Sequence, residues 1–103
     1  MTGRRIAFQA IASAAVSRAD AIVSRWLPDG RREGSEWVAR NPRRSDKRLG
    51  SFKVNLKTGR WGDFAAGETG GDLISLAAFV HGIDQAEAAC RLAEMIGMDP
   101  YDD

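Results

Sequence analysis

Cysteine and histidine are almost absent from this sequence of 103 residues, which contains only Cys90 and His81. A disulfide framework needs pairs of cysteines, and a structural zinc site takes four ligands drawn mainly from cysteine and histidine. The sequence therefore excludes an internal disulfide and a structural zinc ion as sources of stability. We expect neither a metal nor any other cofactor.

Long hydrophobic runs are missing as well. The longest apolar stretch, residues 6–16, is interrupted by Gln9 and Ser13, and neither membrane-spanning length nor a signal-peptide cleavage pattern follows it. With 44% hydrophobic and 28% charged residues, the composition is typical of a soluble globular protein. We expect a single domain over residues 1–103, located in the cytoplasm and without a membrane partner. So short a chain buries only a small core, which favours binding on an outer face over a deep catalytic cleft.

Positive charge is scarce in residues 61–103, where Arg91 is the only cation, although the net charge of the whole chain is +1. The charge balance is +2 in residues 1–24, +7 in residues 25–60 and −8 in residues 61–103. This segregation favours a basic face that contacts phosphates, with the acidic part facing elsewhere. The alternative is a solvated surface whose charges are segregated without functional consequence.

The N-terminal unit, residues 1–30, has the pattern of a helix. Apolar side chains recur at three- and four-residue steps over residues 6–27, which predicts one continuous amphipathic helix. Pro28 and Gly30 are expected to end it, since proline disfavours helix in the residue before it and Asp-Gly favours a turn.

Residues 51–64 have the pattern of a β-hairpin. Phe52 and Val54 share one face of the first strand, while Lys53 and Asn55 share the other. A tight turn then leads into a return strand. We therefore expect a small antiparallel sheet with an apolar underside and a cationic outer surface.

Two helices are predicted at the C-terminal end. Asp72 is expected to cap the first, which ends at Gly82, and Asp84 with Glu87 forms a capping box for the second. A phosphate-binding loop before Asp72 is the weaker interpretation, because its carboxylate would repel the anion. The predicted fold is α+β: a small antiparallel sheet packed with an N-terminal helix and two C-terminal helices, followed by a flexible acidic tail over residues 98–103.

Five short motifs follow one another within residues 34–97. They are Asn41-Pro42, Gly50-Ser51-Phe52-Lys53-Val54-Asn55, Gly59-Arg60-Trp61-Gly62-Asp63-Phe64, Gly70-Gly71-Asp72-Leu73-Ile74 and Gln85-Ala86-Glu87-Ala88-Ala89. In this order they resemble the zinc-binding, zinc-ribbon domain at the N-terminus of bacterial, phage and plasmid DNA primases. The resemblance implies a zinc-ribbon-like sheet and a role in DNA replication or in a mobile element. In that family the domain assists a separate catalytic core in recognising template.

The zinc ligands of that family are absent from this sequence. Their positions correspond to Asn41, a residue among 43–45, Asp63 and Ala66. None of these offers the thiolate or imidazole of a zinc site. We expect a metal-free form in which hydrophobic contact alone holds the hairpin. The aromatic residues expected to provide that contact are Trp37, Phe52, Trp61 and Phe64, with Trp26 added from the N-terminal helix.

Basic residues in the loop before the hairpin, and on the hairpin itself, predict a nucleic-acid-binding surface. The candidate residues are Arg40, Arg43, Arg44, Lys47, Arg48, Lys53, Lys57, Arg60 and Trp61. Phosphate contacts supply affinity without reading sequence, and Trp61 would stack on a base unless it belongs to the core. The expected partner is single- or double-stranded DNA. The resemblance adds a primase or helicase catalytic domain or protein.

Residues with catalytic potential have simpler interpretations. His81 is expected at a helix end, and Cys90 is expected to be a small buried residue. The acids Asp63, Glu68 and Asp72 have two interpretations, as ligands of a magnesium ion or as part of a solvated loop. The sequence thus predicts a binding module without catalysis of its own. The alternative is a protein-interaction domain of a replication or mobile-element protein that has lost DNA binding. A small hydrolase would need an acid cluster that the sequence does not show.

Overall fold

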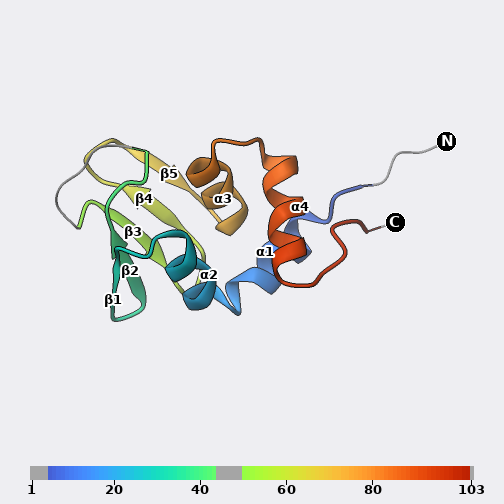
Figure 1. The fold of residues 1–103 in the computed structure, drawn as a ribbon, viewed down its shortest axis with the longest axis horizontal. Helices are drawn as coiled ribbons and strands as arrows, with labels where there is room; N and C mark the ends of the chain where they lie inside the picture. The colour runs from blue at the N-terminus through green and yellow to red at the C-terminus, as the bar shows by residue number, and fades with distance from the viewer. Residues whose placement is uncertain (1–4, 44–49, 103) are drawn as a thin grey trace.

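A sheet at one end and a group of helices at the other make up the α+β fold of this chain, which confirms the predicted class (Figure 1). The computed structural model describes residues 5–43 and 50–102, with extents of 50 × 23 × 18 Å. The elements are α1 (Phe8–Val16), α2 (Ala19–Trp26), β1 (Arg31–Glu33), β2 (Glu36–Ala39), β3 (Phe52–Asn55), β4 (Trp61–Asp63), β5 (Glu68–Gly70), α3 (Leu73–His81) and α4 (Gln85–Met95). Within the described part of the chain, no helix combines the length and apolar character that a membrane span requires.

The N-terminal segment forms two helices, so the prediction of one continuous helix is wrong. The break falls at Ser17 and Arg18. The hydroxyl of Ser17 donates a hydrogen bond to the carbonyl of Ala14 at 2.7 Å, and the amide of Arg18 donates to Ala15 at 2.9 Å. These three-residue steps tighten the last turn of α1. After the break the two helices take different partners, because α1 packs against α3 and α4 while α2 packs against β2.

The sheet is an antiparallel meander in which each strand pairs with the next along the chain. The predicted hairpin is confirmed as β3 and β4, with Phe52 opposite Asp63 and Val54 opposite Trp61. The edge strands β1 and β5 are additions to the predicted sheet. Each of these two strands has only three residues, too few to show an alternating pattern.

Three stacked aromatic rings form the contact between the sheet and α3. Phe52 is fully buried, and its ring centroid lies 5.6 Å from that of Trp61 and 5.8 Å from that of Phe79. The indole nitrogen of Trp61 donates a hydrogen bond to the hydroxyl of Ser75 at 2.9 Å. The polar atom of this buried tryptophan is thereby satisfied, as a core position requires.

Three of the aromatics predicted to hold the hairpin do not belong to this contact. Trp26 packs its ring against His81 instead. Phe64 is 78% exposed, so its assignment to the core is wrong. Trp37 is half-buried, and its indole nitrogen donates to the carbonyl of Leu27 at 3.0 Å. Phe79, which the prediction did not include, takes the third place in the stack.

A buried polar bridge joins the end of β2 to the end of β4. Asn41 and Asp63 are each 1% exposed, and the side-chain amide of Asn41 donates to the carboxylate of Asp63. The amide also lies 3.3 Å from a carboxylate oxygen of Glu68. In addition, Asn41 accepts from the amide of Arg43, and Asp63 accepts from that of Ala65, both at 2.8 Å. The hairpin is therefore not held by hydrophobic contact alone, which corrects the prediction.

Both C-terminal helices begin at the predicted caps. Asp72 accepts from the amide of Ser75 at 2.8 Å, and the hydroxyl of Ser75 completes a capping box. Asp84 accepts from the amide of Glu87 at 2.8 Å. The side chain of Glu87, however, pairs with Arg91 one turn further on, so only half of the second predicted box forms.

The two ends of the described chain lie side by side at the pole opposite to the sheet (Figure 1). Ile6 and Tyr101 form an antiparallel bridge, the amide of Ala7 donates to Pro100 at 2.8 Å, and the amide of Asp102 donates to Arg5 at 2.9 Å. Residues 98–102 are thus tied to the start of α1, which corrects the prediction of a free tail. Residue 103 lies outside the described residues.

Candidate nucleic-acid interface

The sheet has one face turned away from the aromatic stack, and we call it the open face. In β3, Phe52 and Val54 are buried while Lys53 and Asn55 are partly exposed, so the predicted alternation is confirmed. Opposed residues in antiparallel strands lie on the same face. The pairing of Lys53 with Gly62, and of Gly62 with Thr69, therefore extends the open face across β4 and β5.

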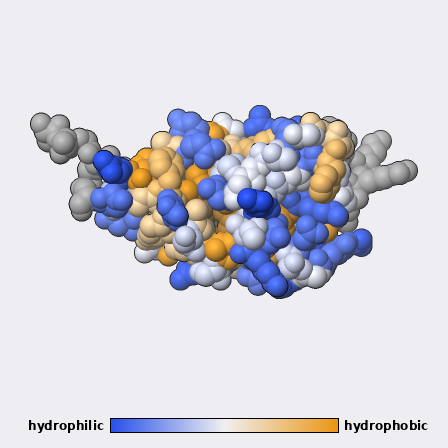
Figure 2. Space-filling view, turned by 180° about the vertical axis from the view of Figure 1, so that it is seen from behind, coloured by the Kyte–Doolittle hydropathy of each residue, from blue (hydrophilic) through white to orange (hydrophobic). Residues whose placement is uncertain are grey.

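A shallow groove of about 420 Å³ follows the open face. Its lining consists of Glu36, Lys53, Asn55, Arg60, Trp61, Gly62, Phe64 and Thr69. Figure 2 shows the molecule from behind, where the half that holds the sheet is mostly hydrophilic, with a hydrophobic patch at its outer end. The groove thus combines polar groups and cations with exposed aromatic surface.

Phe64 is the most exposed large apolar side chain in the described part of the chain, at 78%. It directly follows Asp63, whose side chain faces inward, so strand alternation turns the phenylalanine outward. The Lys53 ammonium lies 5.7 Å from the centroid of its ring, within the range of a cation–π contact. An aromatic face and a cation are therefore held together at the surface.

Trp61 does not have the exposed ring that base stacking requires. It is only 7% exposed, and both neighbouring aromatics of the stack cover it. The proposed stacking role of Trp61 is therefore wrong, and Phe64 is the aromatic in that position. Its place in the strand alternation, one residue after Asp63, was the signal that would have revealed it.

The structure distributes the predicted cations over several surfaces. Lys53 and Arg60 line the groove of the open face, and Lys57 is exposed in the turn between β3 and β4. Arg40 follows β2 and lines a separate hollow. Three further candidates, Arg44, Lys47 and Arg48, lie outside the described residues.

Arg43 contacts the end of α3 and does not line the groove of the open face. Its guanidinium donates a hydrogen bond to the carbonyl of Phe79 at 3.2 Å and lies 6.0 Å from the centroid of that ring. It also approaches Gly82 so closely that a Cβ built there would come within 2.7 Å of it. A cation at the last carbonyls of a helix is a stabilising cap. This contact gives Arg43 a structural function.

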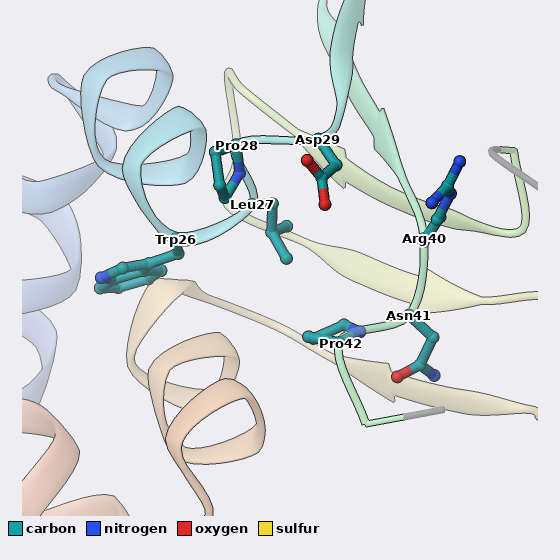
Figure 3. Close-up of a pocket in the computed structure, with 7 residues that line it drawn as sticks. All are labelled: Trp26, Leu27, Pro28, Asp29, Arg40, Asn41 and Pro42. Atoms are coloured by element: carbon teal, nitrogen blue, oxygen red, sulfur yellow. The ribbon is translucent and has the colours of Figure 1, made fainter. Parts of the chain in front are cut away.

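The hollow beside Arg40 has a volume of about 280 Å³ (Figure 3). It is lined by Trp26, Leu27, Pro28, Asp29, Arg40, Asn41 and Pro42. Figure 3 shows Asp29 and Arg40 on opposite sides of its upper end. The carboxylate of Asp29 offsets the single cation of this hollow, whereas the groove has two cations, Lys53 and Arg60, to one acid, so the hollow is a weaker candidate for phosphate binding.

The described residues at the family's metal positions do not fit a metal ion. Asn41 and Asp63 bind each other, and Ala66 contributes only its backbone amide, 3.3 Å from the Asp63 carboxylate. Of the suggested magnesium ligands, Glu68 approaches Asn41 and Asp72 caps α3. Among residues 5–43 and 50–102, no group of three or more His, Cys, Asp or Glu side chains could hold a metal. The magnesium interpretation is therefore not supported.

Comparison with known proteins assigns no family to this chain. A scan of protein-family models finds no match, and a search of curated proteins finds none either. The functional proposal therefore depends on the exposed aromatic ring and the cations of the open face.

Proposed function

We propose that this chain is a DNA-binding module that holds a single strand on the open face of its sheet, without catalysis of its own. The observation that carries the proposal is the ring of Phe64, 78% exposed and placed beside the ammonium of Lys53. Stacking of a base on an exposed aromatic contributes about 1–3 kcal/mol and tolerates any sequence. The neighbouring cations supply the phosphate contacts.

The shape of the groove favours a single strand over a duplex. Gly62 has no side chain and Thr69 has a short one, so the open face is low along β4 and β5, next to the paired Lys53 and Phe64. Bases in a duplex are stacked on one another and cannot stack on Phe64 without unpairing, which costs a few kcal/mol. Single-stranded DNA is therefore the expected ligand.

The resemblance to the zinc-binding domain of DNA primases supports the same proposal. It suggests that the strand is a template and that a separate primase or helicase domain carries out the chemistry. A cytoplasmic location belongs to the proposal as well. Arg44, Lys47 and Arg48 would add phosphate contacts from the segment that joins β2 to β3.

Fluorescence anisotropy of labelled single-stranded and duplex oligonucleotides tests this function. We expect the single strand to bind more tightly, with an affinity that falls as salt is raised. Phe64→Ala should weaken binding by roughly 5- to 100-fold, the equivalent of one lost stacking contact. Phe8→Ala is the matched control. Phe8 is also an exposed phenylalanine, at 43%, but it lies on α1, which packs against α3 and α4. No binding of the single strand at low salt would contradict the proposal.

The alternative is a protein-interaction domain, and the exposure of Phe8 is the observation in its favour. An aromatic on a helix surface is a common anchor at protein interfaces. Sedimentation at increasing protein concentration distinguishes the two functions. Self-association that Phe8→Ala abolishes, together with an absence of DNA binding, would support the interaction domain.

A further inference from the structure

A cleft separate from the groove of the open face lies among the helices, formed by residues of α2, of α4 and of the last turn of α3. Its volume is about 650 Å³, larger than the groove of the open face. The cleft is lined by Arg25, Trp26, His81, Arg91, Glu94 and Met95. It shares no lining residue with the open-face groove, so its function is a separate question.

The aromatic part of the cleft is held in place by a ring contact. The rings of Trp26 and His81 meet edge to face, with centroids 5.7 Å apart and planes at 86°. Nδ1 of His81 lies 3.0 Å from the carbonyl of Ala77. Because a carbonyl only accepts, this nitrogen carries a proton and donates it to Ala77, which fixes the orientation of the ring. The cleft thus contains a fixed indole beside a hydrogen-bonding group.

The cationic part of the cleft consists of two arginines. Arg25 is exposed in the last turn of α2 and has no hydrogen-bond or ion-pair partner within the described residues. Arg91 binds Glu87 through one nitrogen of its guanidinium, and its side chain is 60% exposed. A guanidinium has five N–H donors in a planar fork that matches phosphate, so both arginines retain donors for an anion. Glu94 is the single acid in the lining.

We infer that this cleft binds a nucleoside 5′-phosphate, with the base against Trp26 and the phosphate at Arg25 and Arg91. An aromatic ring and a phosphate together use both parts of the cleft, whereas inorganic phosphate would leave the indole without a ligand. The same chemistry occurs in a free nucleotide and at the phosphorylated 5′ end of a strand. The inference does not depend on DNA binding at the open face.

Titration of the ¹⁵N-labelled protein with AMP, followed by NMR, tests the inference. Shifts should concentrate at Arg25, Trp26, His81 and Arg91, and adenosine or pyrophosphate alone should bind more weakly than AMP. Arg25→Ala and Arg91→Ala should each weaken binding about tenfold, as expected for the loss of a charge-assisted hydrogen bond. Arg31→Ala is the matched control, since Arg31 is an equally charged side chain, 67% exposed, in β1.

Two comparisons separate the sources of the ligand and the two sites. A 5′-phosphorylated oligonucleotide and its unphosphorylated counterpart are titrated into Phe64→Ala, in which the open face is impaired. If the phosphorylated strand shifts the cleft residues and its unphosphorylated counterpart does not, the ligand is a strand end. If AMP shifts them and the phosphorylated strand does not, the ligand is a free nucleotide. The inference is overturned if neither ligand shifts the cleft residues, or if Arg31→Ala weakens AMP binding as much as Arg25→Ala does.

Discussion

Phe52 and Phe64 are residues of the same type near the same end of one hairpin, yet one is completely buried and the other is 78% exposed. Phe52 stacks on Trp61 and Phe79 between the sheet and α3, while Phe64 lies on the opposite face beside Lys53. The difference follows from strand alternation, which sends neighbouring side chains to opposite faces. One hairpin therefore has a buried, stabilising face and an open face that is exposed to solvent.

The sharpest test of this difference replaces each phenylalanine in turn. Phe52→Ala should lower the free energy of unfolding by about 3–5 kcal/mol, because it removes a fully buried ring and leaves a cavity. Phe64→Ala should change it by no more than about 0.5 kcal/mol, as is usual at exposed positions. Urea unfolding followed by circular dichroism measures both. Equal destabilisation by the two substitutions would show that the faces are not distinct.

The polar bridge on the buried side should give the next largest effect. Asn41→Ala leaves the carboxylate of Asp63 without one of its donors, which should cost about 1–3 kcal/mol. Thr69→Ala on the open face serves as the control, and we expect it to be nearly neutral. A neutral Asn41→Ala in the same urea experiment would mean that the bridge does not stabilise the hairpin.

Removing the cap of α3 should have a smaller effect on stability. This helix covers the buried face, so the variant also tests whether the two faces are independent. Asp72→Ala removes the acceptor for the amide of Ser75 and should cost about 1 kcal/mol. Binding at the open face should be unchanged in this variant when it is measured well below its unfolding temperature. Loss of DNA affinity in the folded variant would indicate that the two faces are coupled.

Lys53→Gln on the open face should change the free energy of unfolding only slightly. Only the contact with the Phe64 ring is lost, worth about 0.5 kcal/mol at an exposed site. In the anisotropy experiment, the same variant should reduce the salt slope of binding by about 1, the contribution of one phosphate contact. An unchanged slope would place the strand away from Lys53.

Local patterns predicted the parts of the fold that depend on local chemistry. The alternation over residues 51–56 correctly separated Lys53 from Phe52, and the aspartates at 72 and 84 correctly marked two helix starts. The break between α1 and α2 had no such signal. Ile11 and Ala15 before it, and Ile22 after it, continue one helical stripe. The hydrogen bonds of Ser17 and Arg18 that tighten the last turn of α1, and the different packing partners of the two helices, become visible only in the structure.

The candidate site was predicted in part. Lys53 and Arg60 were chosen for their charge and lie on the open face, whereas Arg43 was chosen on the same grounds and caps α3. Charge alone does not distinguish a free cation from one that binds a distant carbonyl. Trp61 was correctly included among the core aromatics, but Phe64 was assigned to the wrong face, because size and apolar character do not report which side of a strand a residue occupies. The register of the strand decides that.

The hydrogen-bonded pairing of residues 5–7 with residues 100–102 has a practical consequence for handling the molecule. A tag, a surface linker or a fused domain attached at either terminus would leave from the same pole, remote from the sheet (Figure 1). Immobilisation through either end would thus leave the groove accessible to solution. The same proximity makes the chain suitable for circular permutation, with a short connection across the old ends and a new opening in a surface turn.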